Sequence, residues 1–499
     1  MRKKLSLLVI LLVAVVCAAC GRMTNIETEK ESSVEETIEA DGNTTEIPNE
    51  EVTEAPTEAT VRENWKLEGL PAYEGENALG KNVYNGGTGL MDLGQREPDG
   101  CQMQVVTETD LEEVAAYAVL LQENGYELFS VEEQEQNRFY RLRAGERKVY
   151  LSYFGVKERV NIIVDDTGVF PEEISYTYEP AEGERAEIYC YGIKMDPDGM
   201  NTGKNPNNSD NYPNNGQLMV IKCADNSVII VDGANSVQMR AAEQKEFDRF
   251  LHEITETAEG ERIRISAWFL THYHSDHFRG VMDFLKKYGE YYQVERLISN
   301  KPDFDTIDGG SSYTLELATL FISKYPDCKE VKLHTGEKVQ IADITLHALY
   351  SHEDNTSKTA KSSIVDFNDT TLVVRVNDTE GMEMLILGDI NGNGEKILCS
   401  QYGPSTLKSD IVQAAHHNFN YLTTSYDYAE AAYAVFTQSR NGLVKNASSK
   451  KNSDYVKERC EEWFCTGNET VGFAVVDGQV EVIYQEELIF DPRVAKNVQ

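Results

Sequence analysis

The heptapeptide THYHSDH occupies residues 271–277 and holds three of the nine histidines of the 499-residue chain. The residues just before it, 263–270, are mostly apolar and β-prone, which predicts a strand. After it, apolar residues recur at helical spacing from Phe278 to Tyr288, which predicts a helix. The heptapeptide is therefore expected at a strand-to-helix turn.

The side chains of this turn can converge only if the chain bends. A straight strand would point His272, His274 and Asp276 to one side and His277 to the other. A bend at Ser275-Asp276 brings all four together. Neutral imidazole and carboxylate are ligands that Zn accepts, and that Fe or Mn accept less selectively. The alternative is that Asp276 caps the helix and the histidines are polar loop residues. Because histidine is scarce elsewhere, the pattern favours a metal site.

Other candidate ligands follow predicted strands. Asp232 comes after the strand 227–231, Asp389 after 384–387, and the pair His416-His417 after 411–415. From Ala186 onward, many strands alternate with helices, which predicts an α/β sandwich. Active sites of layered α/β folds gather at strand ends, so these side chains are expected to belong to one site.

These residues resemble the metallo-β-lactamase superfamily over about residues 186–487. Its signature, His-x-His-x-Asp-His, is present within 271–277, and Asp232, Asp389 and His416-His417 match its other motifs in order. The resemblance implies a four-layer αββα sandwich, and it is strongest to the extracellular hydrolase domain of competence-type DNA-uptake proteins and to phosphorylcholine esterases. The stretches that point to these two groups are Gly216-Gln217, Val231-Asp232-Gly233, residues 368–373 and Ala415-His416-His417.

The chain departs from the competence-type pattern at two places. Asn418-Phe419 follows the paired histidines where that type has Gly-Ser, and no histidine follows Arg440-Asn441. A further histidine before the bridging aspartate is also uncertain in position. His352, just past the predicted strand 344–349, is the best placed candidate, because His347 lies inside that strand and His334 comes earlier.

The resemblance implies a centre of two divalent metal ions, with Zn favoured and Mn or Fe as alternatives. Two adjacent cations would lower the pKa of a water molecule and stabilise charge on a phosphoryl or carbonyl oxygen. Asp276 and Asp389 would be the catalytic carboxylates, and Asp232 would orient a ligand. The implied ligands are His272, His274 and the candidate His352 for one ion, and Asp276, His277 and one of His416 or His417 for the other, with Asp389 between the ions.

The first twenty residues have the pattern of an export signal. Arg2, Lys3 and Lys4 precede an apolar core at 7–16, and small residues lead to Cys20. This resembles a bacterial lipoprotein signal peptide, residues 1–20, in which Cys20 is lipidated, with plain secretion as the alternative. Residues 21–64 then hold 13 Asp or Glu against 3 Lys or Arg and show no apolar period, which predicts a disordered acidic tether.

Residues 65–180 are predicted to form a small α+β domain before a hydrolase domain at 181–499. The sequence 109–112 fits a capping box that starts a helix ending at Asn124-Gly125. Strands are expected at 126–132, 138–143, 148–154 and 159–164, and a linker at 166–184. A packing or spacer role is expected, with a module that grips the envelope or the substrate as the alternative.

Charge and cysteine content narrow the possible partners. The formal net charge is −37, and the sequence shows no basic patch for nucleic acid. Tight binding to nucleic acid is therefore not expected. Lys445, Lys450 and Lys451 could line a cleft or form a solvated loop. Seven cysteines after the signal, an odd number with loose spacing, do not form a disulfide framework. Cys460 and Cys465 could pair, although a helix predicted over 454–463 would make the bridge awkward.

Together, these patterns predict a membrane-anchored extracellular metal-dependent hydrolase. Its substrates would be phosphodiesters or related esters, either small molecules or envelope polymers, and a lipid would hold it to the outer face of the membrane. The alternative is a non-catalytic envelope binding protein on a metallo-hydrolase scaffold.

Overall fold

The computed structural model describes residues 65, 67–73, 82–86, 101–166, 169–193, 216–236, 239–301, 317, 320–321, 323–355, 367–444 and 446–488. All of them belong to the compact unit Pro56–Gln499. The predicted signal peptide with Cys20, the tether and most of the loop expected at 194–216 lie outside the described residues. Within the described part, no helix combines the length and the apolar character needed to cross a membrane.

A six-stranded antiparallel sheet forms the first folded part, in the order β1-β2-β6-β5-β4-β3. The four strands predicted from the sequence are confirmed as β3 to β6. Two more strands, β1 and β2, complete the sheet. The bounds are β1 Asn82–Gly86, β2 Cys101–Thr107, β3 Glu127–Gln134, β4 Asn137–Ala144, β5 Arg147–Phe154 and β6 Arg159–Asp165.

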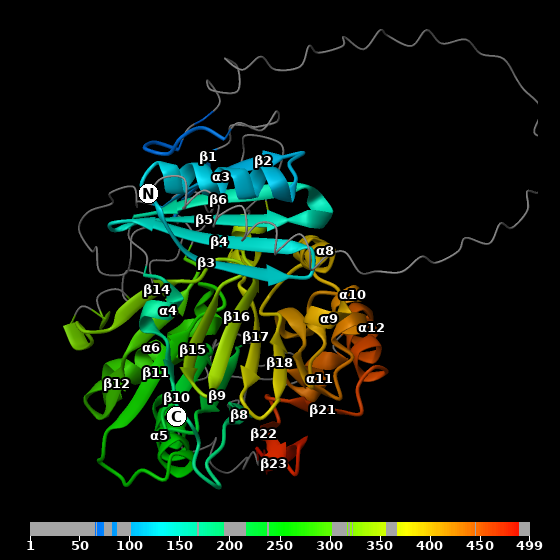
Figure 1. Ribbon diagram of the computed structural model, residues 1–499. Coiled ribbons are helices and arrows are strands. Elements are labelled where there is room, and N and C mark those ends of the chain that lie inside the picture. The colour runs from blue at the N-terminus through cyan, green and yellow to red at the C-terminus, as the bar shows by residue number, and fades with distance from the viewer. Residues whose placement is uncertain are drawn as a thin grey trace, which may run out of the picture. The chain divides into compact units, whose positions relative to one another are not determined.

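One helix, α3 (Leu111–Glu123), covers one face of this sheet (Figure 1). The predicted capping box is shifted by one residue. Asp110, not Thr109, is the N-cap, and its side chain accepts a hydrogen bond from the backbone N of Glu113 at 2.9 Å. Thr109 instead donates its hydroxyl to Glu113 Oε2 at 2.7 Å. The predicted C-terminal end at Asn124-Gly125 is confirmed, with Gly125 at φ +96°.

Two larger sheets follow. The first has the order β14-β13-β11-β10-β9-β8-β22-β23, with β12 beside β11, and the second the order β21-β20-β19-β18-β17-β16-β15-β7. The strands of the first are β8 Glu187–Cys190, β9 Leu218–Lys222, β10 Val228–Asp232, β11 Ile263–Phe269, β12 Tyr292–Val294, β13 Arg296–Ser299, β14 Lys329–Lys332, β22 Glu469–Val476 and β23 Gln479–Glu487. Those of the second are β7 Tyr176–Thr177, β15 Lys338–Ala342, β16 Ile344–Tyr350, β17 Val373–Asp378, β18 Glu383–Ile386, β19 Ile411–Gln413, β20 Tyr433–Phe436 and β21 Glu462–Cys465.

The alternation of side chains along β10 shows how the layers are built. Val228 and Ile230 point to a core shared with helices, whereas Ile229 and Val231 point to the core between the two sheets. Both sides are fully buried. Strands buried on both faces read as continuous apolar runs, which is why this stretch shows no polar alternation.

Helices cover the outer face of each sheet, so the chain folds as a four-layer αββα sandwich preceded by a small α+β domain, as predicted (Figure 1). The helices α5 and α6 pack on the first sheet, and α8, α10 and α12 on the second. Their bounds are α5 Ala241–Ile254, α6 Ser275–Tyr288, α8 Gly392–Gln401, α10 Thr424–Ala429 and α12 Ala447–Lys457.

Some local predictions are wrong. The helix expected over 454–463 ends at Lys457, and the rest of that stretch leads into β21, because its apolar residues pack as an edge strand beside β20. Cys460 and Cys465 do not pair, and no described cysteine forms a disulfide. The linker expected at 166–184 carries the short helix α4 (Pro171–Ile174) and β7, which pairs with β15.

The small sheet is joined to the sandwich by polar contacts, of which those of Asn137 and Asn161 are buried. Asn137 Nδ2 donates to the carbonyl of Gln401 at 2.8 Å, and Asn161 Nδ2 donates to the carbonyl of Glu353 at 3.1 Å. Glu135 accepts from the backbone N of Gly403 at 2.9 Å. Because buried polar atoms are costly to leave unpaired, these contacts fix how the small sheet packs.

Replacing Phe473 by Ala tests the core between the sheets. This ring is fully buried in β22, away from the candidate ligands. We expect Phe473→Ala to lower the free energy of unfolding by about 3–5 kcal/mol, the usual effect of removing a buried phenyl ring. Val156→Ala is the control, because Val156 is 57% exposed and its loss should change stability by no more than about 0.5 kcal/mol. Urea unfolding followed by tryptophan fluorescence measures both, and equal midpoints would contradict the layered core.

Candidate metal centre

The histidine turn is held between two layers. Strand β11 is buried and runs parallel to β10 and β13, and Leu270 N extends the pairing by donating to the carbonyl of Ile298 at 2.9 Å. Helix α6 begins at Ser275, so the chain turns at the predicted place. Gly280 in α6 lies against the loop after β10, where a Cβ would come within 2.6 Å of the Gly233 carbonyl oxygen. This close approach sets α6 beside the end of β10.

A first group of candidate ligands consists of His272, His274 and Asp389. One ligand atom from each lies within 4.8 Å of the others. His272 Nε2 and His274 Nδ1 are 3.2 Å apart, and His272 Nε2 is 3.7 Å from Asp389 Oδ2. His272 and Asp389 are buried, whereas His274 is partly exposed. The group therefore opens to solvent on the side of His274.

A second group consists of Asp276, His277 and His417, whose ligand atoms also lie within 4.8 Å of one another. The Nε2 atoms of His277 and His417 are 3.2 Å apart, and His417 Nε2 is 3.4 Å from Asp276 Oδ2. His277 and His417 are 140 positions apart in the sequence, so the packing of the two sheets brings them together.

Asp389 belongs to the first group and also lies close to the imidazoles of the second. Its Oδ2 is 3.7 Å from His272 Nε2 in the first group, and 3.3 and 3.7 Å from His277 Nε2 and His417 Nε2 in the second. The carboxylate is 1% exposed. A single oxygen that reaches imidazoles of both groups is where a carboxylate bridging two cations would lie.

The backbone is unusual where these ligands leave their strands. His416, His417 and Asn418 have φ angles of +50°, +49° and +67°, three consecutive left-handed residues with side chains. Such conformations cost about 1–3 kcal/mol each and persist where the surroundings enforce them. Gly388 also has positive φ, and a Cβ there would lie 2.6 Å from Thr371 Cγ2 and 3.3 Å from Thr271 Cβ, next to His272. Gly388 thus allows the loop of Asp389 to approach the loop of His272.

Asp232 supports the turn from beneath. Its Oδ1 accepts from the backbone N of Thr271 at 2.7 Å, and its Oδ2 accepts from Thr271 Oγ1 at 2.8 Å and from His277 Nδ1 at 2.7 Å. A carboxylate that accepts a hydrogen bond from Nδ1–H fixes the tautomer of the ring, and Nε2 can then bind a cation. Asp232 is fully buried and has φ +58°, so the end of β10 is shaped to hold it.

The charges of the centre depend on one another. Burial, and then the nearby His277, lowers the pKa of His272 well below its usual value. Burial disfavours charge on His277 as well, but Asp389 and Asp232 raise its pKa well above normal. Burial also opposes ionisation of Asp389, yet His277 and His417 bring its pKa well below normal. Without a cation, a proton on His277 balances the two carboxylates, which is the positive charge that metal ions would supply.

The four remaining histidine candidates lie in different surroundings. His416 Nε2 is 3.7 Å from Asp389 Oδ2, but this partly exposed residue belongs to neither ligand group. His352 is buried in the turn 352–354, where burial lowers its pKa to about 3, and it too belongs to neither group. His347 lies inside β16, and His334 belongs to a separate cluster. The roles of His352, His416 and the grouped residues as ligands stay predictions.

Three threonines were not foreseen from the sequence. Thr437 Oγ1 is hydrogen-bonded to His417 Nδ1 at 2.8 Å, as Asp232 is to His277. Thr371 Oγ1 accepts from the backbone N of Asp389 at 3.3 Å, and Thr271 binds Asp232. Thr271 and Thr437 stand at the ends of predicted strands, and that position was the available signal.

One sequence model matches part of the chain. Residues 212–314 match the sequence model described as the Metallo-beta-lactamase superfamily. A search of curated proteins found no match. Solved structures with a similar fold include the metallo-beta-lactamase fold protein YhfI from Bacillus subtilis, with 12% identity, covering 60% of this chain and 98% of that chain at a TM-score of 0.31.

Two other solved structures are similar to a comparable degree. MEM-A1, a subclass B3 metallo-beta-lactamase from a soil metagenome library, shares 12% identity over 49% of this chain and 89% of its own, with a TM-score of 0.26. A possible metal-dependent hydrolase from Veillonella parvula DSM 2008 shares 11% identity over 53% of this chain and 96% of its own, with a TM-score of 0.28.

The sequence match and the αββα layers identify a metallo-beta-lactamase superfamily domain. The chain is a metal-dependent hydrolase. Its residues fit divalent cations, because two groups of imidazole and carboxylate side chains meet at the buried carboxylate of Asp389.

Replacing Asp232 by Asn tests the support beneath the second group. An amide cannot hold the Nδ1 proton of His277 as a carboxylate does, so we expect metal affinity to fall by about 10–100-fold. Equilibrium dialysis against graded free Zn measures the change. Asp225→Asn is the control, because Asp225 is a partly buried carboxylate that pairs with Arg264 at 3.0 Å, outside both ligand groups. Equal Zn affinities of the two variants would contradict a role of Asp232 in supporting the centre.

Proposed function

We propose that this hydrolase cleaves phosphodiester or related phosphoester bonds at the outer face of a cell membrane, with two divalent metal ions of which Zn is favoured. The observation that carries the proposal is the position of Asp389 Oδ2 within 3.7 Å of imidazoles from both ligand groups. Paired cations suit phosphoryl transfer, because they can neutralise charge on both the attacking and the leaving oxygen.

The residues of the centre have distinct tasks in this proposal. His272, His274 and Asp389 would hold one ion, and Asp276, His277, His417 and the same Asp389 the other. When bound, the ions activate water and stabilise negative charge on the phosphoryl group. Asp232 and Thr437 keep the rings of His277 and His417 in place through hydrogen bonds of 2.7 and 2.8 Å.

The first group would hold its ion with two imidazoles and one carboxylate, so water or substrate could take a further position. Catalytic sites characteristically keep such a position for water or substrate. His416 lies beside it, with its Nε2 3.7 Å from Asp389 Oδ2 and its side chain 25% exposed. We assign His416 to contact with the substrate, where the ring can donate a hydrogen bond to a phosphoryl or leaving-group oxygen.

Two of the three lysines singled out in the sequence, Lys450 and Lys451, lie in α12. Asn452 in α12 donates to the carbonyls of Asn418 at 3.0 Å and Asn420 at 2.6 Å, which ties α12 to the left-handed turn. The next residue back, Lys451, lies 4.2 Å from the centre of the Tyr421 ring. Lys450 is paired with Asp454 at 2.5 Å, and Lys445 lies outside the described residues.

The hollow that Lys450 and Lys451 line also carries Asp454 and Glu458 and includes none of the candidate ligands, so these lysines do not make a basic surface at the centre. A long polyanion would meet the overall charge of −37, which opposes it. A small phosphodiester or the phosphoester of an envelope polymer is therefore the favoured substrate class, and nucleic acid is disfavoured.

The proposed location comes from the sequence of the N-terminal region. A signal peptide ending at Cys20 would leave a lipidated N-terminus, and the acidic residues of 21–64 would hold the hydrolase away from an anionic membrane surface.

Turnover of bis-(p-nitrophenyl) phosphate in the presence of Zn or Mn tests the activity. We expect release of nitrophenol by the full chain, and a loss of at least about 100-fold in His274→Ala, the scale of removing a well-placed electrostatic group. His252→Ala is the matched control, since His252 lies on α5 outside every ligand group. Activity that survives His274→Ala with bound metal would contradict a catalytic role for the first group.

The same assay, run with choline phosphates, lactones and β-lactams beside the phosphodiester, tests the substrate class. Preference for a lactone or a β-lactam would contradict the phosphoester proposal. Retained metal without turnover of any ester would contradict the hydrolase and favour the envelope binding protein.

Replacing Cys20 by Ser tests the anchor. Without the thiol that carries the lipid, we expect the chain to move from the membrane fraction to the soluble fraction of a bacterial host, and incorporation of labelled palmitate to cease. Cys399→Ser should stay at the membrane. An unchanged distribution of Cys20→Ser would contradict a lipid anchor at that residue.

A further inference from the structure

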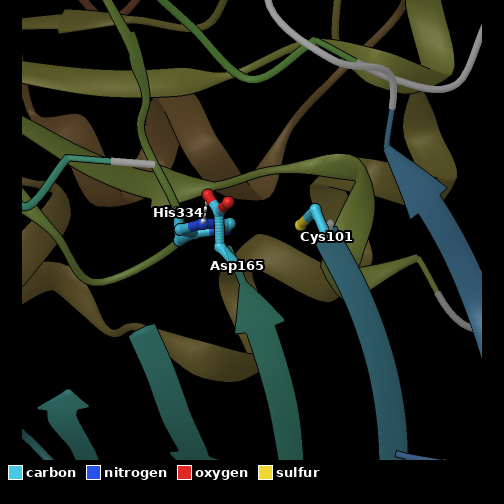
Figure 2. A group of neighbouring side chains, drawn as sticks. All are labelled: Cys101, Asp165 and His334. Carbon is cyan, nitrogen blue, oxygen red and sulfur yellow. Dashed lines mark ion pairs between the residues drawn. The ribbon is translucent and has the colours of Figure 1, made fainter. Parts of the chain in front are cut away.

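A second cluster of metal-ligating side chains lies where the small sheet meets the sandwich. Cys101 begins β2 and is directly opposite Asp165, the last residue of the neighbouring antiparallel strand β6. His334 comes from the sandwich, in the loop between β14 and β15. All three side chains are at most 1% exposed. Figure 2 shows His334 against Asp165, with the sulfur of Cys101 turned toward them.

The distances suit coordination of one small cation. A ligand atom of each residue lies within 4.8 Å of the other two, and His334 Nε2 is 3.7 Å from Asp165 Oδ2. Ligand atoms around a tetrahedral Zn lie roughly 3.3–3.8 Å from one another, given the usual bond lengths to nitrogen, oxygen and sulfur. Small rotations of the Cys101 side chain would therefore complete the geometry.

The imidazole of His334 is oriented as a ligand would be. Its Nδ1 donates to Glu353 Oε1 at 2.8 Å, so the other nitrogen faces Asp165 and Cys101. His334 Nε2 is buried and has no hydrogen-bond partner in the described structure. Histidine ligands usually donate their second N–H to a carboxylate in this way.

The surroundings of the cluster are buried, and they contain two further polar atoms that could interact with a cation. The Tyr150 ring lies 4.3 Å from the His334 ring, centre to centre, and the apolar cluster of the sheet encloses the site from below. Tyr150 OH and Glu337 Oε1 are buried and have no hydrogen-bond partner among the described atoms. The nearest cross-strand cation, Lys148, donates its ammonium to the carbonyl of Glu146 at 2.9 Å. Arg141 acts electrostatically on Glu337, and a cation bound beside His334 would act on Asp165.

We propose that Cys101 Sγ, a carboxylate oxygen of Asp165 and His334 Nε2 bind a divalent cation of the Zn class. One thiolate, one imidazole and one carboxylate are a donor set that selects Zn over Mg or Ca. Water would fill a fourth position. Because two ligands come from the small sheet and one from the sandwich, the ion would clamp these two parts together.

This site is distinct from the hydrolytic centre in its ligands. Neither ligand group around Asp389 includes a cysteine, whereas the clamp contains a thiolate. In the absence of a cation, His334 would carry the balancing charge itself: burial opposes this, but Glu353 and Asp165 raise the pKa of its imidazole to about 10. A cation at Nε2 would displace that proton, as metal binding to histidine requires.

Cobalt substitution of the full chain distinguishes a thiolate site from the hydrolytic centre. A thiolate-to-cobalt bond gives a charge-transfer band in the near ultraviolet, which imidazole and carboxylate ligands do not give. We expect this band in the wild type, its loss in Cys101→Ser, and a fall of about one bound metal per chain in that variant. The band should persist in Cys399→Ser, a partly exposed cysteine outside the cluster.

Two results would overturn the proposal. One is a wild-type protein that binds cobalt without the band. The other is a band of unchanged intensity in Cys101→Ser. The wild-type spectrum decides the question even if the variant fails to fold, and far-ultraviolet circular dichroism shows whether it has folded. The outcome does not depend on turnover of any ester, so it is separate from the proposed function.

Discussion

The buried carboxylate of Asp389 is the constraint on which the site depends. One oxygen of this group lies among imidazoles that come from two sheets, at distances of 3.3 to 3.7 Å. Burying an ion without compensation costs several kcal/mol, so the loops around it must supply positive charge and hold it in place. That requirement accounts for Asp232 beneath His277, for Thr437 behind His417 and for the close approach of loops that Gly388 allows.

The fold brings these groups together because its parallel strands end at the same edges. Strands β10 and β11 in one sheet, and β18, β19 and β20 in the other, run parallel in pairs. Each ends at, or is followed by, a residue of the centre or its support. The apolar core between the sheets fixes the distance between those edges. Local strain at His416 to Asn418 is tolerated because α12 and the Asp389 loop hold the turn on both sides.

Much of this could be predicted from the sequence, because it rests on local patterns. Strand and helix periods located β11 and α6, and the spacing of the heptapeptide indicated convergence at Ser275. The choice between His416 and His417 could not be made, because it depends on three left-handed residues that no local propensity favours. The positions of His352 and His334 depend on how the small sheet packs against the sandwich. Cys101 and His334 are far apart in the chain, and the sequence gives no sign that they meet.

Anomalous diffraction from crystals grown with Zn is the most direct measurement of the central claim. We expect two peaks on either side of the Asp389 carboxylate, one contacting His272 and His274 and the other contacting Asp276, His277 and His417. A single peak that does not touch Asp389, or no peak near these side chains under Zn-replete conditions, would contradict a centre of two metal ions.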